Sequence, residues 1–174
     1  EARKRASEYT ILNNWTRLSV ASEIIVEPRK PVLSFGTVPV SLAPGGFLQA
    51  VHHVEEAMAA LVCLHLAKSK KIADLFAGAG SFTFRLAEKS AVHAVESDAG
   101  SVASLDLAWK HVQGLKPISA EKRDLFRRPL IPFELKAYDG VVFDPPRAGA
   151  EAQCGVLAKS AIKRIAAVSC NPIT

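Results

Sequence analysis

The chain has 174 residues, 49% of them hydrophobic, which excludes a disordered or fibrous protein because one domain of this length can bury a core. Lysine and arginine outnumber the acids by 22 to 17, and the net charge of +5 suits an RNA partner, although scattered basic residues also fit solvated faces. Three widely spaced cysteines without a CxxC pair indicate neither a disulfide framework nor a zinc site, and we predict no metal.

The sequence begins at Glu1 and ends at Thr174, directly after an apolar run, which predicts a segment of a longer protein. It contains no run of roughly 18 apolar residues, the length of a membrane span, and no signal-peptide pattern. A cytoplasmic location is therefore expected.

Residues 1–46 carry the apolar runs SEIIVEP and PVLSFGTVPVSL, which are separated by prolines and glycines and predict a short β-rich segment. Residues 47–174 are predicted to form a second unit. Between Val54 and about Ala67 the apolar residues recur at helical spacing. Glu55 and Glu56 lie near the start of this stretch, where the helix dipole favours acids, so a helix is predicted there.

Strands and helices alternate through the rest of the chain. The predicted strands are KIADLFAG, AVHAVES, PISAEKRD, DGVVFDPP and IAAVSCNP, and the predicted helices include FTFRLAEKS and SVASLDLAWKHV. This alternation predicts an α/β fold with an open, doubly wound, mostly parallel sheet. In such sheets ligands bind outside the carboxyl ends of the strands, where the strand order reverses.

The first of these strands leads into a turn that contains Gly78 and Gly80. Glycines allow a ligand to approach the backbone closely, although the pattern also fits a simple strand-to-helix turn. Glu96 ends the second strand roughly 20 residues later, where an acid suits ribose hydroxyls, while Asp98 is predicted to cap the next helix. These residues predict an adenosine-containing ligand, either a nicotinamide dinucleotide or S-adenosylmethionine.

The fourth and fifth strands end in reactive residue types. Asp144 precedes two prolines that stiffen the backbone, so its carboxylate is predicted in the cleft, and Arg147 suits a phosphate, a base edge or an exposed structural role. Cys170, next to Asn171, is predicted to face the Asp144 loop as a nucleophile. The alternative, a buried structural cysteine, fits Cys63 on its apolar helix face better.

Taken together, DLFAGAGSFTFRLA, AVESD, DGVVFDPPRAGA and AVSCNPIT resemble, in order and spacing, the RNA uracil-5 methyltransferase family. The upstream segment PGGFLQ is also similar to a motif of that family, so the resemblance covers roughly residues 47–174. It implies a Rossmann-like fold and S-adenosylmethionine-dependent methylation of carbon 5 of uridine in tRNA or rRNA. The implied mechanism passes through a covalent cysteine adduct.

The resemblance also assigns roles to residues. It implies Cys170 as the nucleophile, Asp144 in catalysis, and RNA contacts from Arg147 and Asn171. The implied cofactor contacts are Gln49, Phe76, Gly78, Gly80, Ser81, Glu96, Asp124 and Asp144.

The sequence departs from the family in three ways. Val51 replaces a common asparagine, the first forty residues lack the cysteine cluster that binds an iron–sulfur centre in some relatives, and the expected general base, a glutamate, would lie beyond Thr174. Four alternatives stay open: an RNA 5-methylcytosine methyltransferase, an amino-group methyltransferase, a nicotinamide-dependent oxidoreductase and a non-catalytic RNA-binding module.

Overall fold

The computed structural model describes residues 1–21, 23–49 and 51–169. The helices are α1 (Ala2–Leu12), α2 (His52–His65), α3 (Thr83–Ala87), α4 (Ala99–Trp109), α5 (Pro132–Leu135) and α6 (Glu151–Leu157). The strands are β1 (Leu18–Val20), β2 (Glu23–Val26), β3 (Val32–Phe35), β4 (Val38–Ser41), β5 (Lys71–Leu75), β6 (Ala91–Glu96), β7 (Ile118–Lys122), β8 (Gly140–Phe143) and β9 (Arg164–Ala167).

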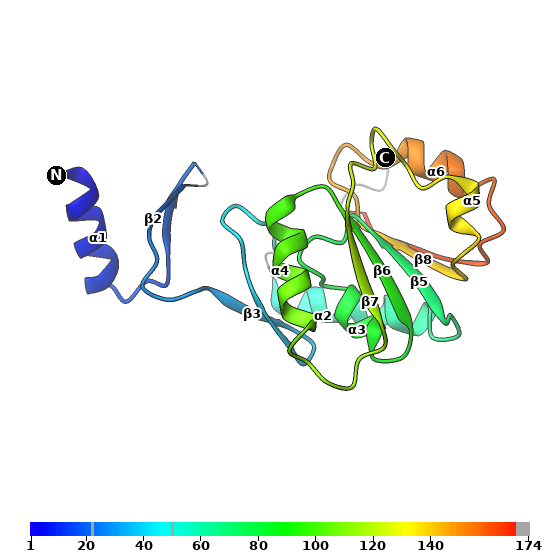
Figure 1. Cartoon of the computed structure of the whole chain (residues 1–174), viewed down its shortest axis with the longest axis horizontal. Helices are drawn as coiled ribbons and strands as arrows, with labels where there is room; N and C mark the ends of the chain where they lie inside the picture. Colours follow the sequence, from blue (N-terminus) through cyan, green and yellow to red (C-terminus); the bar gives the residue numbers. More distant parts are fainter. Residues whose placement is uncertain (22, 50, 170–174) are drawn as a thin grey trace.

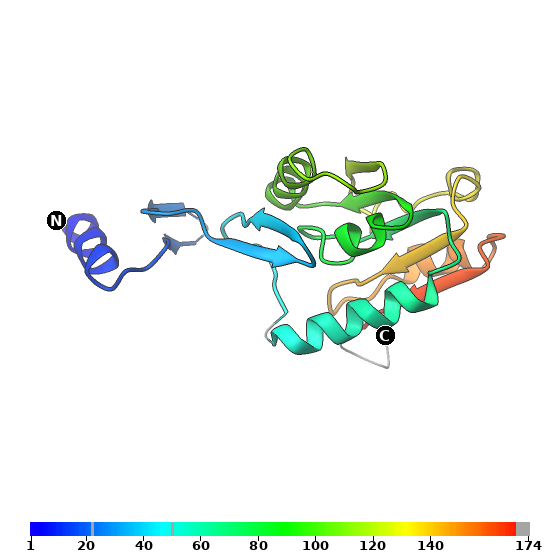
Figure 2. The ribbon, with the colours of Figure 1, turned by 90° about the horizontal axis from the view of Figure 1, so that it is seen from below.

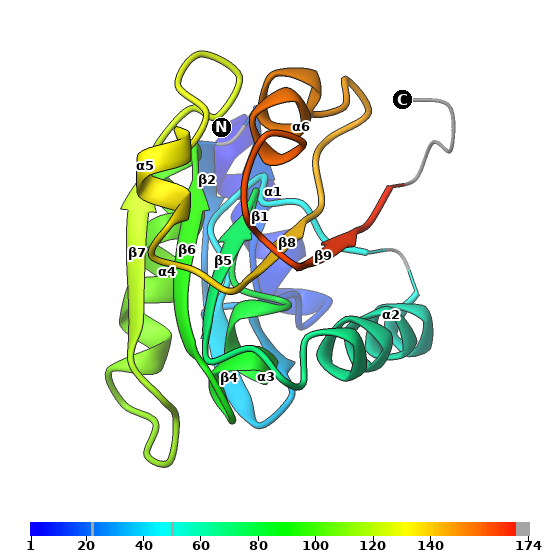
Figure 3. The same cartoon turned by 90° about the vertical axis from the view of Figure 1, so that its right-hand side faces the viewer.

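A five-stranded parallel sheet forms the centre of the molecule, with the strand order β7-β6-β5-β8-β9 (Figure 3). The chain runs outward from β5 through β6 to β7 and then returns to the other side of β5 for β8 and β9. The strand order therefore reverses between β5 and β8, the place where sheets of this kind bind ligands. The predicted α/β, doubly wound parallel sheet is confirmed.

Helices cover both faces of this sheet. On one face α2, α3 and α4 contribute Val62, Phe84 and Leu105 to one buried apolar cluster. On the other face α5 and α6 contribute Leu135 and Leu157 to a second buried cluster. The two clusters fix the sheet between its layers, so that the loops at the carboxyl ends of the strands start from a rigid base.

The N-terminal residues form two antiparallel hairpins, β1–β2 and β3–β4, preceded by α1. Phe35, Val38 and Val40 of the second hairpin are buried in the same cluster as α2, α3 and α4. Helix α1 and the first hairpin are set apart from this body in both Figure 1 and Figure 2. The sequence pattern predicted the strands but not α1. This helix has no apolar stripe that could signal it, and its residues are mostly exposed.

The remaining elements differ from the predictions in detail. Helix α2 is confirmed, with bounds shifted by two residues toward the N-terminus. Helix α3 has only 5 residues, and α5, with Pro132 in its first turn, was not predicted. Within the described ranges, none of the helices is both long and apolar enough to span a membrane.

Candidate functional site

The carboxyl ends of β5, β6 and β8 meet at one edge of the sheet. The Ala77 amide donates to the Val95 carbonyl at 3.1 Å, and the Asp144 amide donates to the Leu75 carbonyl at 3.3 Å. Between these contacts Phe76 has a φ of +59°, a left-handed conformation that is uncommon for a residue with a side chain. The chain thus turns sharply as it leaves β5, and local backbone strain of this kind clusters at ligand sites.

The glycine turn and Glu96 are joined directly. The Gly78 amide donates to Glu96 Oε2 at 2.9 Å, and the Ser97 and Asp98 amides donate to Oε1 at 2.6 and 2.8 Å. The Glu96 carboxylate is therefore held against the turn. The structure brings together two residues that the sequence could relate only by their spacing.

Two further residues, Gly80 and Asp98, shape the backbone on either side of this contact. Gly80 has a φ of +101°, and a Cβ added there would lie 2.6 Å from the Phe84 ring, so only glycine fits. Asp98 caps α4 by accepting a hydrogen bond from the Ser101 amide at 2.7 Å, which confirms its predicted role.

A buried acid, Asp74, lies beneath this site and was not singled out from the sequence. Thr83 Oγ1 donates to its Oδ2 at 2.5 Å, whereas Oδ1 has no hydrogen-bond partner among the described residues. Burial, together with the nearby charges of Asp144 and Glu96, raises the pKa of Asp74 to about 7. Burial also raises the pKa of Asp144. The only sequence signal for Asp74 is an acid inside the apolar run of β5.

Replacing Asp74 with asparagine is expected to stabilise the protein increasingly as the pH rises. The folded-state pKa of about 7 exceeds the ordinary 3.8, so the stability that the protonated carboxyl contributes is complete below pH 3.8 and is lost as the pH rises through about 7. Asparagine does not ionise. In thermal unfolding, the melting temperature of D74N minus that of the wild type should increase over this interval and then level off. A difference that is constant with pH would contradict the assignment.

Asp124 and Phe126 reach the same edge from the loop after β7. The Arg123 amide donates to the Glu96 carbonyl at 2.8 Å, which fixes the start of this loop beside β6. Asp124 Oδ1 accepts from the Phe126 amide at 2.9 Å, and the Phe126 ring centre lies 5.5 Å from that of Phe76. The loop after β7 is thus connected both to Glu96 and to the turn that follows β5.

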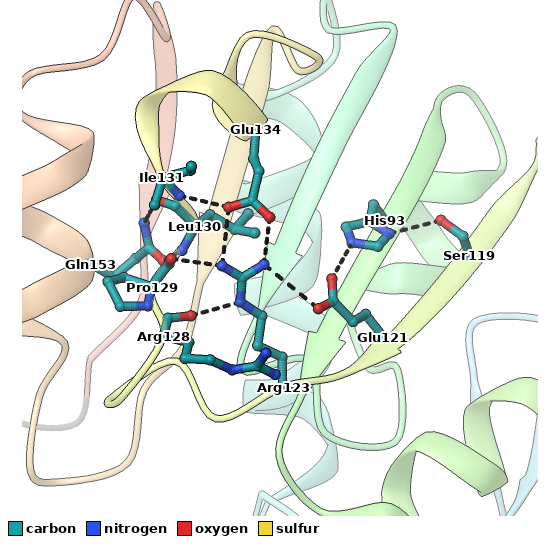
Figure 4. A network of polar contacts seen from close by, with 10 residues as sticks. All are labelled: His93, Ser119, Glu121, Arg123, Arg128, Pro129, Leu130, Ile131, Glu134 and Gln153. Carbon is teal, nitrogen blue, oxygen red and sulfur yellow. Dashed lines mark hydrogen bonds and ion pairs between the residues drawn. The ribbon is translucent and has the colours of Figure 1, made fainter.

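The Arg123 side chain holds this loop in place (Figure 4). Its guanidinium donates to Glu134 at 2.6 and 3.0 Å, to the Arg128 carbonyl at 2.7 Å and to the Pro129 carbonyl at 2.8 Å. The hydrogen bond to Glu134 is the main cause that raises the Arg123 pKa, and it also lowers the Glu134 pKa. One arginine thereby joins the loop after β7 to α5, a role that the sequence pattern did not indicate.

An ion pair on the other side of the sheet holds the glycine turn. Arg85 donates to the two Glu55 carboxylate oxygens at 2.6 and 2.9 Å and to the Ser81 carbonyl at 2.7 Å. Glu55 was predicted only as a favourable residue near a helix start, and Arg85 was not singled out. Together they tie α2 to the candidate cofactor residue Ser81.

Among the described residues, Gln49 and Arg147 form no hydrogen bond or ion pair with the residues above. Gln49 is half-buried between β4 and α2, and Arg147 is exposed in the loop after β8. Cys170 and Asn171 lie outside the described residues. The described chain nevertheless approaches this edge, since the Val168 amide donates to the Phe143 carbonyl at 2.9 Å. No group of three or more His, Cys, Asp or Glu suited to a metal occurs in the described part.

Comparison with known proteins decides the family. A family model described as tRNA (Uracil-5-)-methyltransferase matches residues 39–174, which is most of the chain. The chain belongs to this family. The resemblance to RNA uracil-5 methyltransferases that the sequence motifs indicated is thereby confirmed.

Individual members of the tRNA (uracil-5-)-methyltransferase family match over most of this chain. An uncharacterized RNA methyltransferase of Brucella suis biovar 1 (strain 1330) is 58% identical over 174 residues, 100% of this chain and 42% of the relative. The 23S rRNA (uracil(1939)-C(5))-methyltransferase of Chromohalobacter salexigens is 36% identical over 145 residues, 81% of this chain and 30% of the relative. The chain thus spans less than half the length of these relatives.

A solved structure shows the same fold. The Pyrococcus abyssi tRNA (uracil-54, C5)-methyltransferase in complex with S-adenosyl-L-homocysteine has a TM-score of 0.71 with this family member. The match covers 89% of this chain and 38% of the archaeal chain at 22% sequence identity. At that identity the similarity establishes the shared Rossmann-like architecture.

Proposed function

We propose that this protein methylates carbon 5 of uridine in RNA with S-adenosylmethionine as the methyl donor. Family membership supports the reaction class, and the named relatives act on tRNA uracil and on 23S rRNA uracil. The observation that carries the proposal is the gathering of Asp74, Glu96 and Asp144 at the carboxyl ends of β5, β6 and β8, beside the strand-order reversal.

These acids fit S-adenosylmethionine better than a nicotinamide dinucleotide. The methyl donor carries a positive sulfonium and an ammonium group, which nearby carboxylates attract. The pyrophosphate of a dinucleotide is anionic and needs free backbone amides at the glycine turn. Here the Gly78 amide already donates to the Glu96 carboxylate, and one buried oxygen of Asp74 has no partner among the residues that the structure describes. The charge of the site therefore favours the methyl donor.

Different residues of the chain would bind different parts of S-adenosylmethionine. Glu96 accepts hydrogen bonds from the ribose hydroxyls, one of which would replace the Ser97 hydroxyl that is now 3.0 Å from Oε1. The family resemblance implies further contacts with the methyl donor from four residues: Gln49, Phe76, Ser81 and Asp124. We further propose that residues 47–174 form the catalytic domain and that residues 1–46 are a short β-rich entry segment whose second hairpin packs on that domain. We also propose that the protein acts in the cytoplasm, a location that suits an enzyme with an RNA substrate.

Covalent catalysis by Cys170 would overcome the weak nucleophilicity of uracil carbon 5. When bound, the cofactor supplies a methyl group on a sulfonium. The Cys170 thiolate would add to carbon 6. The π electron pair of the carbon 5–carbon 6 bond would then form a carbon 4–carbon 5 double bond, while the carbonyl π pair moves to oxygen 4. Carbon 5 of this enolate would then accept the methyl group, and S-adenosylhomocysteine would leave with the electron pair of the broken carbon–sulfur bond. A general base removes the carbon 5 proton, and the returning electron pair expels the thiolate from carbon 6.

Asp144 is proposed to hold the polar edge of the uracil during these steps. Its half-buried carboxyl has a pKa raised by burial, so it is suited to donate or accept a hydrogen bond at the ring. Arg147 and Asn171 are proposed to contact the RNA. For a target within a helix, the nucleotide must also be flipped out of its stack, at a cost of a few kcal/mol.

Methyl transfer to RNA of restricted composition tests the proposal. With S-adenosylmethionine that carries a radiolabelled methyl group, the intact protein should label tRNA and rRNA transcripts that contain uridine, and digestion should release 5-methyluridine. Label in 5-methylcytidine would instead support the cytosine alternative. In a parallel measurement, S-adenosylmethionine should raise the melting temperature and NAD should not, because a ligand stabilises only the fold that binds it. The opposite result would contradict a methyltransferase.

A further inference from the structure

The loop after β7 presents an exposed aromatic ring to the candidate cofactor site. Phe126 keeps 47% of its surface exposed, although a phenyl ring of this size is normally buried. Its ring contacts that of Phe76, at a centre distance of 5.5 Å and an angle of 59° between the ring planes. The Phe126 ring is therefore held against protein on one side and open to solvent elsewhere.

The direction in which the cofactor must lie follows from Glu96. If Glu96 binds the ribose, the amino-acid part of the ligand extends toward β5 and β8, where Asp74 and Asp144 can attract its positive charges. The adenine must then extend the other way, over the carboxyl ends of β6 and β7. The Arg123 amide, bonded to the Glu96 carbonyl at 2.8 Å, begins the loop that lies there.

We propose that Phe126 is the residue on which the adenine ring of the bound cofactor stacks, an inference that rests on the proposed function. Hydrogen bonds within the loop after β7 fix the position of this ring. Asp124 Oδ1 holds the Phe126 amide at 2.9 Å, and the Arg123 guanidinium holds the carbonyls of the residues that follow. Stacking needs only the π-face of a base, which a phenyl ring matches. Asp124, with 43% of its side chain exposed, can accept a hydrogen bond from the adenine amino group.

Alanine at position 126 tests the assignment, with Phe133 as a matched control. Phe133 is another exposed phenylalanine, with 77% of its surface accessible, but it lies on α5 and has no ring contact with Phe76. Binding of S-adenosylhomocysteine and of adenosine to the intact protein is measured by calorimetry. F126A should weaken both by about 10-fold, F126W should restore the affinity, and F133A should leave it unchanged.

The outcomes separate this inference from the function on which it rests. In methyl-transfer assays F126A should raise KM for S-adenosylmethionine with little change in kcat, since stacking contributes equally before and during the reaction. If the wild type binds S-adenosylhomocysteine and F126A binds it equally well, the stacking role is wrong while the proposed function stands. If the wild type binds neither S-adenosylhomocysteine nor adenosine, the proposed function fails, and this inference fails with it.

Discussion

Replacing Cys170 with serine is expected to abolish methyl transfer to uridine, with a loss on the order of 10³-fold or more in turnover. A serine hydroxyl remains protonated at neutral pH and adds poorly to carbon 6, so carbon 5 is not activated. The binding of S-adenosylhomocysteine should persist, because the sulfur is not proposed to contact the methyl donor. Turnover is measured with radiolabelled S-adenosylmethionine and uridine-containing RNA under single-turnover conditions.

Cys154 provides the matched control for this experiment. It is a free, exposed cysteine on α6, so C154S removes an accessible thiol without touching the proposed reaction. RNA that contains 5-fluorouridine adds a direct measurement, because fluorine at carbon 5 prevents the final proton removal and traps the adduct. The wild type and C154S should form a covalent protein–RNA band, and C170S should not. Undiminished methylation by C170S would instead support an amino-group methyltransferase, which needs no thiol.

The sequence predicted those features of the fold and the site that depend on local pattern. Alternating strands and helices identify the parallel sheet, and the carboxyl ends of its strands coincide, so Gly78, Glu96 and Asp144 could be assigned to one edge without coordinates. Asp124 was assigned only through the family resemblance. Asp98 could be recognised as a helix cap because capping depends on residues three apart.

The features that were missed depend on packing between distant elements. Arg85 pairs with Glu55, which is 30 residues away in the sequence, and Arg123 pairs with Glu134, which is 11 residues away on α5. Periodicity did not reveal α5 because this helix has only 4 residues. The raised pKa of Asp74 arises from complete burial, which strand pattern alone cannot quantify. Such residues do not form motifs, since their role is set by three-dimensional neighbours.

Replacing Arg123 with alanine is expected to lower the free energy of unfolding by about 2 kcal/mol. The variant loses the paired hydrogen bonds to Glu134 and leaves the Arg128 and Pro129 carbonyls without their donor (Figure 4). The expected loss of stability is smaller than for a fully buried ion pair, because 35% of the Glu134 side chain is exposed and water can partly replace the guanidinium. Urea unfolding of the wild type and the variant measures the difference.

Arg127 separates this structural role from a simple loss of positive charge. It lies in the same loop, but its side chain is 87% exposed and its contact with Asp124 is a single ion pair at 3.6 Å. R127A should therefore change stability by less than about 0.5 kcal/mol. R123K should fall between R123A and the wild type, since an ammonium keeps the charge but cannot reproduce the planar fork. Equal unfolding midpoints for R123A and R127A would show that the guanidinium does not hold the loop.

The pH dependence of the R123A deficit gives a second, independent check. Because the hydrogen bond from Arg123 lowers the folded-state pKa of Glu134, the stability from this pair is present above the ordinary value of 4.5 and is lost as the pH falls through the lowered value. The difference between wild type and R123A should therefore shrink in acid and stay constant toward neutral pH. If it shrinks and the S-adenosylhomocysteine affinity of R123A also drops at neutral pH, then the same contact both stabilises the fold and holds Asp124 and Phe126 at the cofactor edge.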